Sequence, residues 1–402
     1  MRTLPALLLF CVTSTLWSQS LQSKMDSVML HHINAGELHG GVAYVQKDKK
    51  VLLHKAYGFR DVEQKQLLKE DAIFNIASMA KVVTAVGALI LYEDGKFLLD
   101  DPIEMYLPEL GELMVLENIG TDSAKLVPPI RSITIRDLFR HTAGFGYAYQ
   151  MTEAQNSVDS LYVSKELDMS RTSQDFLERL SEIPLKYQPG SQWEYSYALD
   201  VLGFLVEKIS RMTLHDFLKQ NLFGPLEMTS TGFYLNPEDM GRLSNLYVQT
   251  ADGLAAVPDF VSNYKEPPTL YAGGGGLGRS IDGALLSSTA DFAKFCNMLL
   301  DYGQYNGKEI LQSQTVELLI SNQIGGIVKR SFPVGAYGFG VGVSNWPNNG
   351  RTQAISWTGA FNTIFVVNFK VDFVSIFMTQ HEPWGHLDIM DKFLQVIEET
   401  VP

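Results

Sequence analysis

The sequence predicts an α+β fold, in which an antiparallel sheet is built from the N- and C-terminal segments and carries a large, mostly helical insertion. Two β-rich runs, 40–46 and 51–57, lie near the start of the chain, and three more, 352–357, 362–369 and 372–379, lie near its end. Most helical patterns fall between these two groups. Because each apolar face must be buried against another layer, we expect one sheet made from both chain ends and flanked by helices.

Residues 1–20 have the pattern of a secretory signal peptide. An apolar run at 4–12 follows Arg2, and small residues before position 21 allow cleavage after Ser20. The run is too short to cross a membrane as a helix. We therefore expect a mature chain that begins at residue 21 and is secreted or periplasmic.

The overall composition is that of an ordinary globular protein. The chain has 402 residues, 46% of them hydrophobic, and a formal net charge of −13. Its lysines and arginines are scattered, so nothing indicates a nucleic-acid partner. No later apolar run has the length of a membrane span. Cys296 is the one cysteine of the expected mature chain, which excludes an internal disulfide and a cysteine-based metal site.

Residues 21–402 are expected to form one domain with two lobes. An α/β lobe would combine 21–77 with 286–402, and a mostly helical lobe would comprise 78–285. The polar turn 47–50 joins the first two strands in a hairpin. In chain order, helical periodicity is found at 21–33, 82–91, 173–183, 199–209, 215–222, 289–301, 314–321 and 388–400.

Residues 241–285 show little helical period and many turn-forming residues. A stretch of this length without regular structure is usually functional, so we expect a loop region with short strands. Its glycine run, 273–278, formally matches Gly-x-Gly-x-x-Gly. No strand pattern precedes this run and no helix directly follows it, which argues against a dinucleotide-binding site. We expect no cofactor, and the histidines lack metal-ligand spacing.

Ser78-Met79-Ala80-Lys81 combines a hydroxyl and an amine at the start of an apolar helix. Residues three apart lie on one helix face, one turn from each other. A serine hydroxyl becomes an effective nucleophile when a neighbouring base takes its proton. The helix start adds N–H donors where a tetrahedral oxyanion would form. Two common residues at this spacing also recur by chance, and the alternative is a polar helix start with a solvated lysine.

Two further motifs follow in the chain. Tyr195-Ser196-Tyr197 lies just before a helix, and Trp357-Thr358-Gly359-Ala360 ends a strand. With these motifs the chain resembles the serine β-lactamase and penicillin-binding-protein superfamily, and in particular class C β-lactamases and family VIII carboxylesterases. Those proteins carry Ser-x-x-Lys, then Tyr-x-Asn or Tyr-x-Ser, then Lys-Thr-Gly, His-x-Gly or Trp-x-Gly. The resemblance covers residues 40–379 and includes the framework stretches 94–96, 100–102, 138–144, 224–228, 303–311 and 337–340.

The resemblance implies a role for each motif. Ser78 would be the acylated nucleophile, Lys81 would help to activate it, and Tyr195 would take or relay its proton. Which of these two residues is the base stays open. The backbone N–H groups of Ser78 and Ala360 would form the oxyanion hole. Residues that would contact substrate are Tyr197, Trp357, Thr358 and Gly359.

Two departures from the family pattern bear on the substrate. Tyr197 stands where the family has asparagine or serine, and Trp357 replaces a lysine or histidine that often helps to hold a substrate carboxylate. Both changes favour neutral esters over penicillins or D-alanyl peptides. Residues 278–287 also form a longer link than is usual and could reshape the pocket. His141, in the stretch 138–144, is expected in a structural turn rather than in a catalytic triad.

The predicted function is a secreted serine hydrolase that forms an acyl-enzyme on Ser78 and acts on a small or medium ester. The alternatives are a β-lactamase or D-amino-acid peptidase acting on an amide, and a non-catalytic binding or signalling relative that kept the fold. For single residues the alternatives are structural: Tyr195 could close a helix start, and Trp357 could pack in the core. The sequence does not indicate an oligomeric state.

Overall fold

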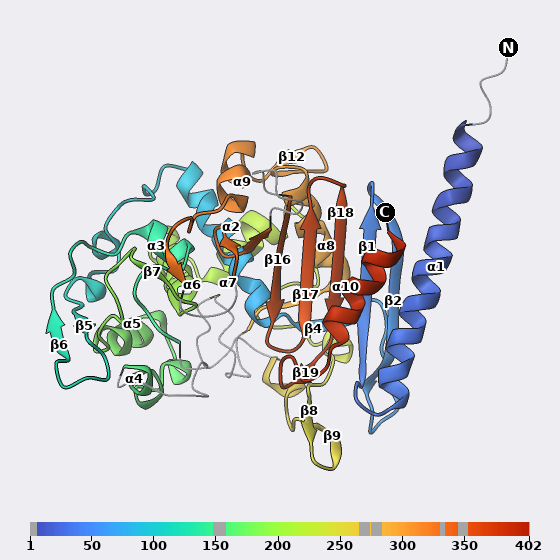
Figure 1. Cartoon of the computed structure of the whole chain (residues 1–402), viewed down its shortest axis with the longest axis horizontal. Coiled ribbons are helices and arrows are strands. Elements are labelled where there is room, and N and C mark those ends of the chain that lie inside the picture. The colour runs from blue at the N-terminus through green and yellow to red at the C-terminus, as the bar shows by residue number, and fades with distance from the viewer. Residues whose placement is uncertain are drawn as a thin grey trace.

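The computed structural model describes residues 6–147, 158–264, 274, 284–329, 334–344 and 353–401, with side chains from residue 20 onward except 262–263. Its centre is an eight-stranded antiparallel sheet (Figure 1). The strand order across this sheet is β14-β15-β16-β17-β18-β1-β2-β3. The strands are β1 (Gly40–Lys47), β2 (Lys50–Asp61), β3 (Gln66–Leu67), β14 (Ala336–Tyr337), β15 (Gly342–Ser344), β16 (Ala354–Gly359), β17 (Thr363–Asn368) and β18 (Phe373–Met378).

The two ends of the chain meet at the pairing of β1 with β18, where Val42 lies opposite Met378. Strand β1 also pairs with β2 through the predicted hairpin. This pairing confirms the predicted α+β fold, with one antiparallel sheet made from both chain ends. Side chains of β1 alternate between the faces, as the period of two in a strand requires. Val42 and Tyr44 join the large core, whereas Ala43 and Val45 join a smaller cluster on the opposite face.

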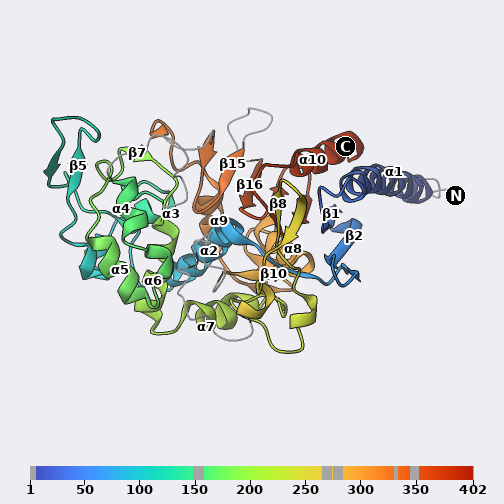
Figure 2. The same ribbon diagram turned by 90° about the horizontal axis from the view of Figure 1, so that it is seen from below.

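Helices cover both faces of the sheet, as Figure 2 shows. On the smaller cluster lie α1 (Ala6–Asn34) and α10 (Ile389–Thr400), and on the other face lies α8 (Thr289–Leu300). Met25 and Met29 of α1 and Phe393 of α10 are fully buried in the smaller cluster. The predicted helix at 21–33 is therefore present, as part of a longer helix that passes through position 20.

The mostly helical part lies beside the opposite end of the sheet from α1 (Figure 1). Its central helix, α2 (Ala80–Glu93), is apolar almost all round, as expected for a helix buried on every side. It packs closely on its neighbours: a Cβ atom added at Gly87 would lie 2.6 Å from Leu218 Cδ2. The other helices are α3 (Ile135–Phe139), α4 (Asp159–Ser164), α5 (Ser173–Ser181), α6 (Ala198–Ser210), α7 (Leu214–Leu218) and α9 (Ser313–Ile320).

The remaining strands are short and make small sheets or hairpins around these layers. They are β4 (Ile73–Asn75), β5 (Val115–Glu117), β6 (Lys125–Val127), β7 (Gln192–Trp193), β8 (Tyr247–Thr250), β9 (Gly253–Ala256), β10 (Leu286–Ser288), β11 (Gln304–Tyr305), β12 (Lys308–Glu309), β13 (Val328–Lys329) and β19 (His381–Glu382).

The structure modifies one sequence expectation and agrees with another. The helix expected at 215–222 ends at Leu218 and continues as a wider π-type segment, Lys219–Phe223. The expected loop region does contain the short strands β8 and β9. Its glycine run, 273–278, lies outside the described residues except for Gly274. The division into two lobes stays a prediction.

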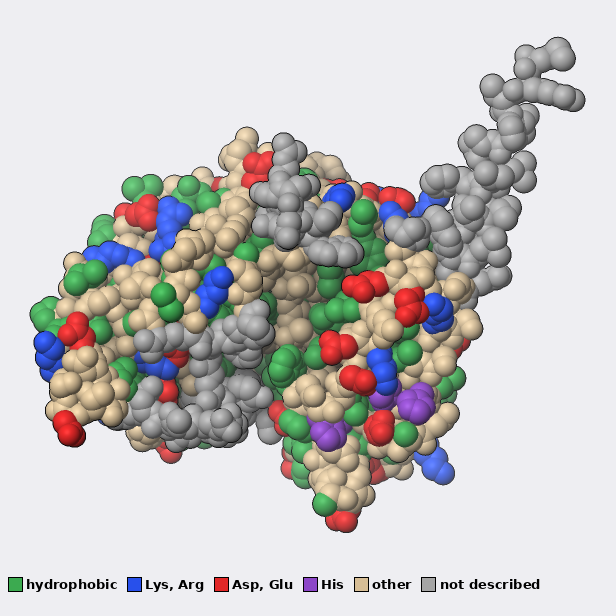
Figure 3. Space-filling model, in the orientation of Figure 1, with side chains coloured by type: hydrophobic (Ala, Val, Ile, Leu, Met, Phe, Trp, Pro, Cys, Tyr) green, Lys and Arg blue, Asp and Glu red, His purple; other side chains and the backbone are tan. Residues whose placement is uncertain are grey.

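The surface shown in Figure 3 carries acidic and basic side chains interspersed among one another, as expected for a globular protein with scattered charges. In the part of the chain that the structure describes, no helix has the length and apolar character needed to cross a membrane.

Two buried histidines are expected to make the fold sensitive to acid. Burial, with a smaller contribution from His381, lowers the pKa of His39 to about 3. Burial, with a smaller contribution from His386, lowers the pKa of His381 to about 4. The unfolded chain binds protons to these groups near pH 6.5, whereas the folded chain does not. The free energy of unfolding should therefore fall as the pH drops from about 6.5 to about 4, by up to roughly 1.4 kcal/mol per pH unit for each histidine.

Urea unfolding at a series of pH values measures this dependence. His39→Gln should reduce the slope between about pH 6.5 and pH 4, since the variant lacks one of the histidines that contribute to it. The same substitution at the exposed His31 serves as the control and should leave the slope unchanged. Equal slopes for wild type and His39→Gln would contradict the assignment.

Candidate active site

Ser78 lies where β4 turns into α2, in a single 3₁₀ turn, η1 (Ala77–Met79). The sequence placed it at the front of the helix, and the structure places it in the 3₁₀ turn that leads directly into α2. The preceding residue, Ala77, has φ +44°, a strained conformation for an L-residue. The side-chain oxygen of Asn75 accepts the Ala77 N–H at 2.8 Å and stabilises this turn. Ser78 itself is half-buried.

Lys81 lies in the first turn of α2 and is 0% exposed. Its Nζ donates a hydrogen bond of 3.3 Å to Ser78 Oγ. The same nitrogen lies 4.5 Å from the centre of the Tyr195 ring and 5.5 Å from that of Tyr147. Aromatic faces attract a cation, and this attraction offsets part of the cost of burying an ammonium group.

Tyr195 lies between β7 and α6, 117 residues from Ser78 in sequence. Its hydroxyl donates to Ser78 Oγ at 2.7 Å. The side chain is buried, and its ring contacts that of Tyr147. The structure thus brings the three predicted residues Ser78, Lys81 and Tyr195 together around one oxygen atom. This is the geometry that a serine nucleophile with neighbouring proton carriers requires.

The end of β16 lies directly against the turn that carries Ser78. A Cβ atom added at Gly359 would lie 2.5 Å from the carbonyl oxygen of Ile76, so only glycine allows this approach. The contact brings Ala360, the next residue, beside η1. Among the described residues, neither the Ser78 N–H nor the Ala360 N–H donates to another group. Two free donors at this position fit an oxyanion hole.

Trp357 and Thr358 are the two residues of β16 that precede Gly359, and both are half-buried. The Trp357 ring lies 5.7 Å from that of Tyr195 and 5.2 Å from that of Tyr337. Thr358 pairs with Ile364 of β17. Trp357 therefore forms an apolar wall next to the proton-carrying phenol.

Tyr197 lies beneath the site rather than on its surface. Its side chain is 1% exposed, and its hydroxyl donates to Asp168 Oδ1 at 2.7 Å. Burial, with the Asp168 carboxylate, raises its pKa well above the usual value. We expected Tyr197 to contact substrate, and this burial instead makes it a support for Tyr147, whose ring lies 4.5 Å away. The Tyr197 ring is larger than the asparagine or serine side chain that the family has at this position, and it points into the core instead.

The sequence did not point to Tyr147, which contacts both Lys81 and Tyr195. It lies in a loop without periodicity, three residues after Gly144, so no pattern marks it. Nor did the sequence indicate the buried ion pair of Lys186 with Glu194, the residue next to Tyr195. Lys186 also lies 2.7 Å from Asp159, so its ammonium group pairs with two carboxylates.

The long link at 278–287 is described only from residue 284. This end is fixed beside the nucleophile: Leu286 pairs with Asn75, and the Ile76 N–H donates to the Leu285 carbonyl at 3.0 Å. The predicted effect of the link on the pocket concerns mainly residues 278–283, which lie outside the described residues.

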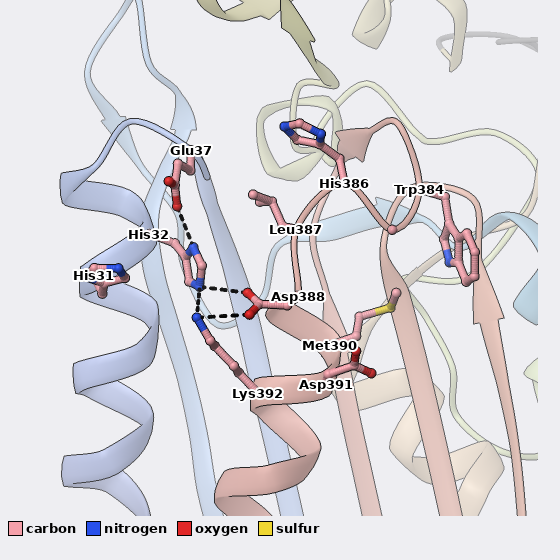
Figure 4. A pocket seen from close by; sticks show the side chains of 11 residues that line it. His31, His32, Glu37, Trp384, His386, Leu387, Asp388, Met390, Asp391 and Lys392 are labelled. Carbon is pink, nitrogen blue, oxygen red and sulfur yellow. Dashed lines mark hydrogen bonds and ion pairs between the residues drawn. The ribbon is translucent and has the colours of Figure 1, made fainter.

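A separate cavity of about 510 Å³ lies between the C-terminal end of α1 and the start of α10 (Figure 4). At its wall, His32 Nδ1 lies 2.8 Å from Glu37, and Lys392 lies 3.1 Å from Asp388. These side chains pair with one another. Within the described part of the chain, no group of three or more histidine, cysteine or acidic side chains is arranged to hold a metal ion.

Comparison with known proteins decides the family. The family model described as Beta-lactamase matches residues 22–397. This chain belongs to the β-lactamase family. Among its relatives, esterase EstB of Burkholderia gladioli is 31% identical over 281 residues, 66% of this chain and 69% of EstB. Penicillin-binding protein 4* of Bacillus subtilis is 26% identical over 360 residues, 86% of this chain and 69% of that protein.

A solved structure shows the same β-lactamase fold. It is that of EstCE1, a hydrolase with promiscuous acyltransferase activity, with a TM-score of 0.78 and 22% identity. The match covers 94% of this chain and 99% of EstCE1. The β-lactamase family contains serine hydrolases, and the relatives of this member include esterases and penicillin-binding proteins.

The contact of Gly359 with Ile76 predicts that Gly359→Ala slows serine acylation. The added methyl would push the end of β16 from η1 and displace the Ala360 N–H. Loss of one oxyanion donor costs on the order of 10²–10³ in rate. The rate of Ser78 labelling by a fluorophosphonate measures the effect. Gly335→Ala is the matched control, because an added Cβ there meets no atom within 4 Å. Equal labelling rates for the two variants would contradict the role of this contact.

Proposed function

We propose that this protein is a secreted serine esterase that hydrolyses small or medium acyl esters through an acyl-Ser78 intermediate. The observation that carries the proposal is the convergence of two hydrogen bonds on Ser78 Oγ, from Tyr195 at 2.7 Å and from Lys81 at 3.3 Å. A serine hydroxyl that meets both a phenol and an amine is placed to lose its proton during attack.

In acylation, Ser78 Oγ attacks the ester carbonyl carbon as its proton passes to the deprotonated member of the pair Tyr195 and Lys81, either a phenolate oxygen or a neutral amine nitrogen. The carbonyl oxygen becomes an oxyanion, held by the N–H groups of Ser78 and Ala360. The bond to the alcohol oxygen then breaks, and that oxygen receives the proton. In deacylation, the same groups take a proton from water, whose oxygen bonds to the acyl carbon. The Ser78 ester bond breaks, and Ser78 regains its proton as the acid leaves.

The preference for esters is supported by the apolar wall at Trp357. An indole ring beside Tyr195 suits the uncharged acyl or alcohol part of an ester. It offers no cation to a substrate carboxylate at the position where many β-lactamases have one. Esterase activity is also what the name of EstB states for that relative.

Covalent labelling tests the nucleophile. A fluorescent fluorophosphonate should label the wild type and should not label Ser78→Ala. Tyr195→Phe removes the phenolic proton carrier but keeps the ring, so its kcat for p-nitrophenyl butyrate should fall by roughly 10²–10⁴. A wild-type protein without label, or a Ser78→Ala variant with equal label, would support the non-catalytic alternative instead.

Parallel turnover of p-nitrophenyl butyrate and of a chromogenic cephalosporin tests the substrate class. We expect the wild type to prefer the ester. Trp357→Lys should lower ester turnover and improve reaction with the cephalosporin, because an ammonium group would then face the substrate carboxylate. Faster wild-type turnover of the cephalosporin would favour the alternative of a β-lactamase or D-amino-acid peptidase.

Secretion is proposed from the N-terminal sequence and is supported by burial. Ser20 is exposed, whereas Leu21 is fully buried, so cleavage after Ser20 would preserve the packing of residues 21–34 on the sheet. N-terminal sequencing of the mature protein should give Leu21. Ser20→Arg should slow processing, because the enzyme that cleaves signal peptides requires a small residue there. A mature chain that retains Met1 would contradict the proposal.

A further inference from the structure

His141 holds the segment that carries Tyr195 at two points, one on each side of the tyrosine. Its carbonyl oxygen accepts the N–H of Glu194 at 3.1 Å. Its ring atom Nδ1 accepts the N–H of Ser196 at 3.2 Å. Both donors are backbone groups of the residues that flank Tyr195. The side chain of Tyr195 then projects between the two contacts to reach Ser78 Oγ.

The His141 ring is packed against the tyrosine that these bonds hold. It is 0% exposed, and its centre lies 4.9 Å from that of Tyr195. It also contacts Trp193 and Tyr337, which close the space around it. Nδ1 accepts a hydrogen bond, so the neutral ring carries its proton on Nε2. Burial and the charge of Lys81 lower the pKa of His141 well below 6.5, which keeps the ring neutral.

The backbone at His141 has φ +55°. A left-handed conformation is strained for an L-residue other than glycine, asparagine or aspartate. Here it allows one residue to present both its carbonyl oxygen and its ring to the same segment. Glycine would adopt this backbone with less strain, but it has no side-chain acceptor for the Ser196 N–H.

We infer that His141 is a positioning residue for Tyr195, which it fixes against Ser78 through its carbonyl oxygen and its Nδ1 atom. The inference rests on the proposed function, since it assigns Tyr195 the transfer of a proton. His141 does not contact Ser78 in this arrangement and acts through the tyrosine. Displacing the phenol by about 1 Å can lower the rate on the order of 100-fold, so the two hydrogen bonds that fix the Tyr195 segment support catalysis.

Substitutions at His141 separate the ring acceptor from the backbone. His141→Leu removes Nδ1, and kcat for p-nitrophenyl butyrate should fall by roughly 10–100-fold with a KM change below about 3-fold. His141→Asn keeps a side-chain acceptor and tolerates φ above zero, so it should restore kcat to within about 5-fold of wild type. Ser196→Ala keeps the backbone N–H and removes only the hydroxyl, which lies 3.1 Å from Nδ1. Its kcat should change less than that of His141→Leu.

A double-mutant cycle with Tyr195→Phe distinguishes positioning from general loss of structure. If His141 acts through Tyr195, adding His141→Leu or His141→Asn to Tyr195→Phe should lower kcat by less than about twofold further. His39→Leu is the matched control: it removes another buried histidine, three strands from β16, and should lower the melting temperature without a comparable loss of kcat.

Independent, additive losses from His141→Leu and Tyr195→Phe would overturn the inference, as would a His141→Asn variant that is folded but no more active than His141→Leu. A wild-type protein that neither hydrolyses the ester nor takes the fluorophosphonate label would instead reject the proposed function. The two failures are therefore distinguishable, because the first requires an active wild type.

Discussion

The geometry of the site depends on a lysine without exposed surface. A buried ammonium group is stable only where hydrogen bonds or aromatic faces replace its lost hydration. Lys81 meets Ser78 Oγ and the rings of Tyr195 and Tyr147. The contacts that accommodate this charge are therefore the contacts that assemble the nucleophile and the phenol. Because α2 is buried on almost every side, Lys81 cannot turn to solvent without disturbing the core.

Three separate parts of the chain supply this site, and one of them, the end of β16, belongs to the eight-stranded sheet. The turn η1 follows β4, Tyr195 precedes α6, and Ala360 follows β16. The pairing of β1 with β18 joins the chain ends in one sheet. The missing side chain at Gly359 then lets β16 approach the Ile76 carbonyl. The glycine of the Trp-x-Gly motif is therefore needed for its small size. The N–H groups of Ser78 and Ala360 lie near each other only if the end of β16 contacts η1.

The layer beneath the site explains how this member of the family accommodates its unusual tyrosine. Tyr197 turns into the core and bonds to Asp168, so its size is used in packing against Tyr147. His141 accepts the N–H groups of both residues that flank Tyr195. The segment that carries Tyr195 is consequently held by hydrogen bonds to His141, and its ring packs against Tyr147, which Tyr197 supports. Such support limits the freedom of a side chain that must meet Ser78 at hydrogen-bond distance.

The sequence by itself determined five of the eight sheet strands and the main helices, and it pointed to the trio Ser78, Lys81 and Tyr195, because strand and helix periods and an ordered set of short motifs are local properties of a chain. The short strands β3, β14 and β15 were found only in the structure. It also indicated Gly359 and Ala360 through the same motif order. Only the tertiary structure decided that Tyr197 is buried and that Tyr147 lies beside Lys81. It likewise decided that His141 supports Tyr195. These roles depend on contacts between residues distant in sequence, and a tyrosine or histidine has the same local pattern whether it faces a substrate or the core.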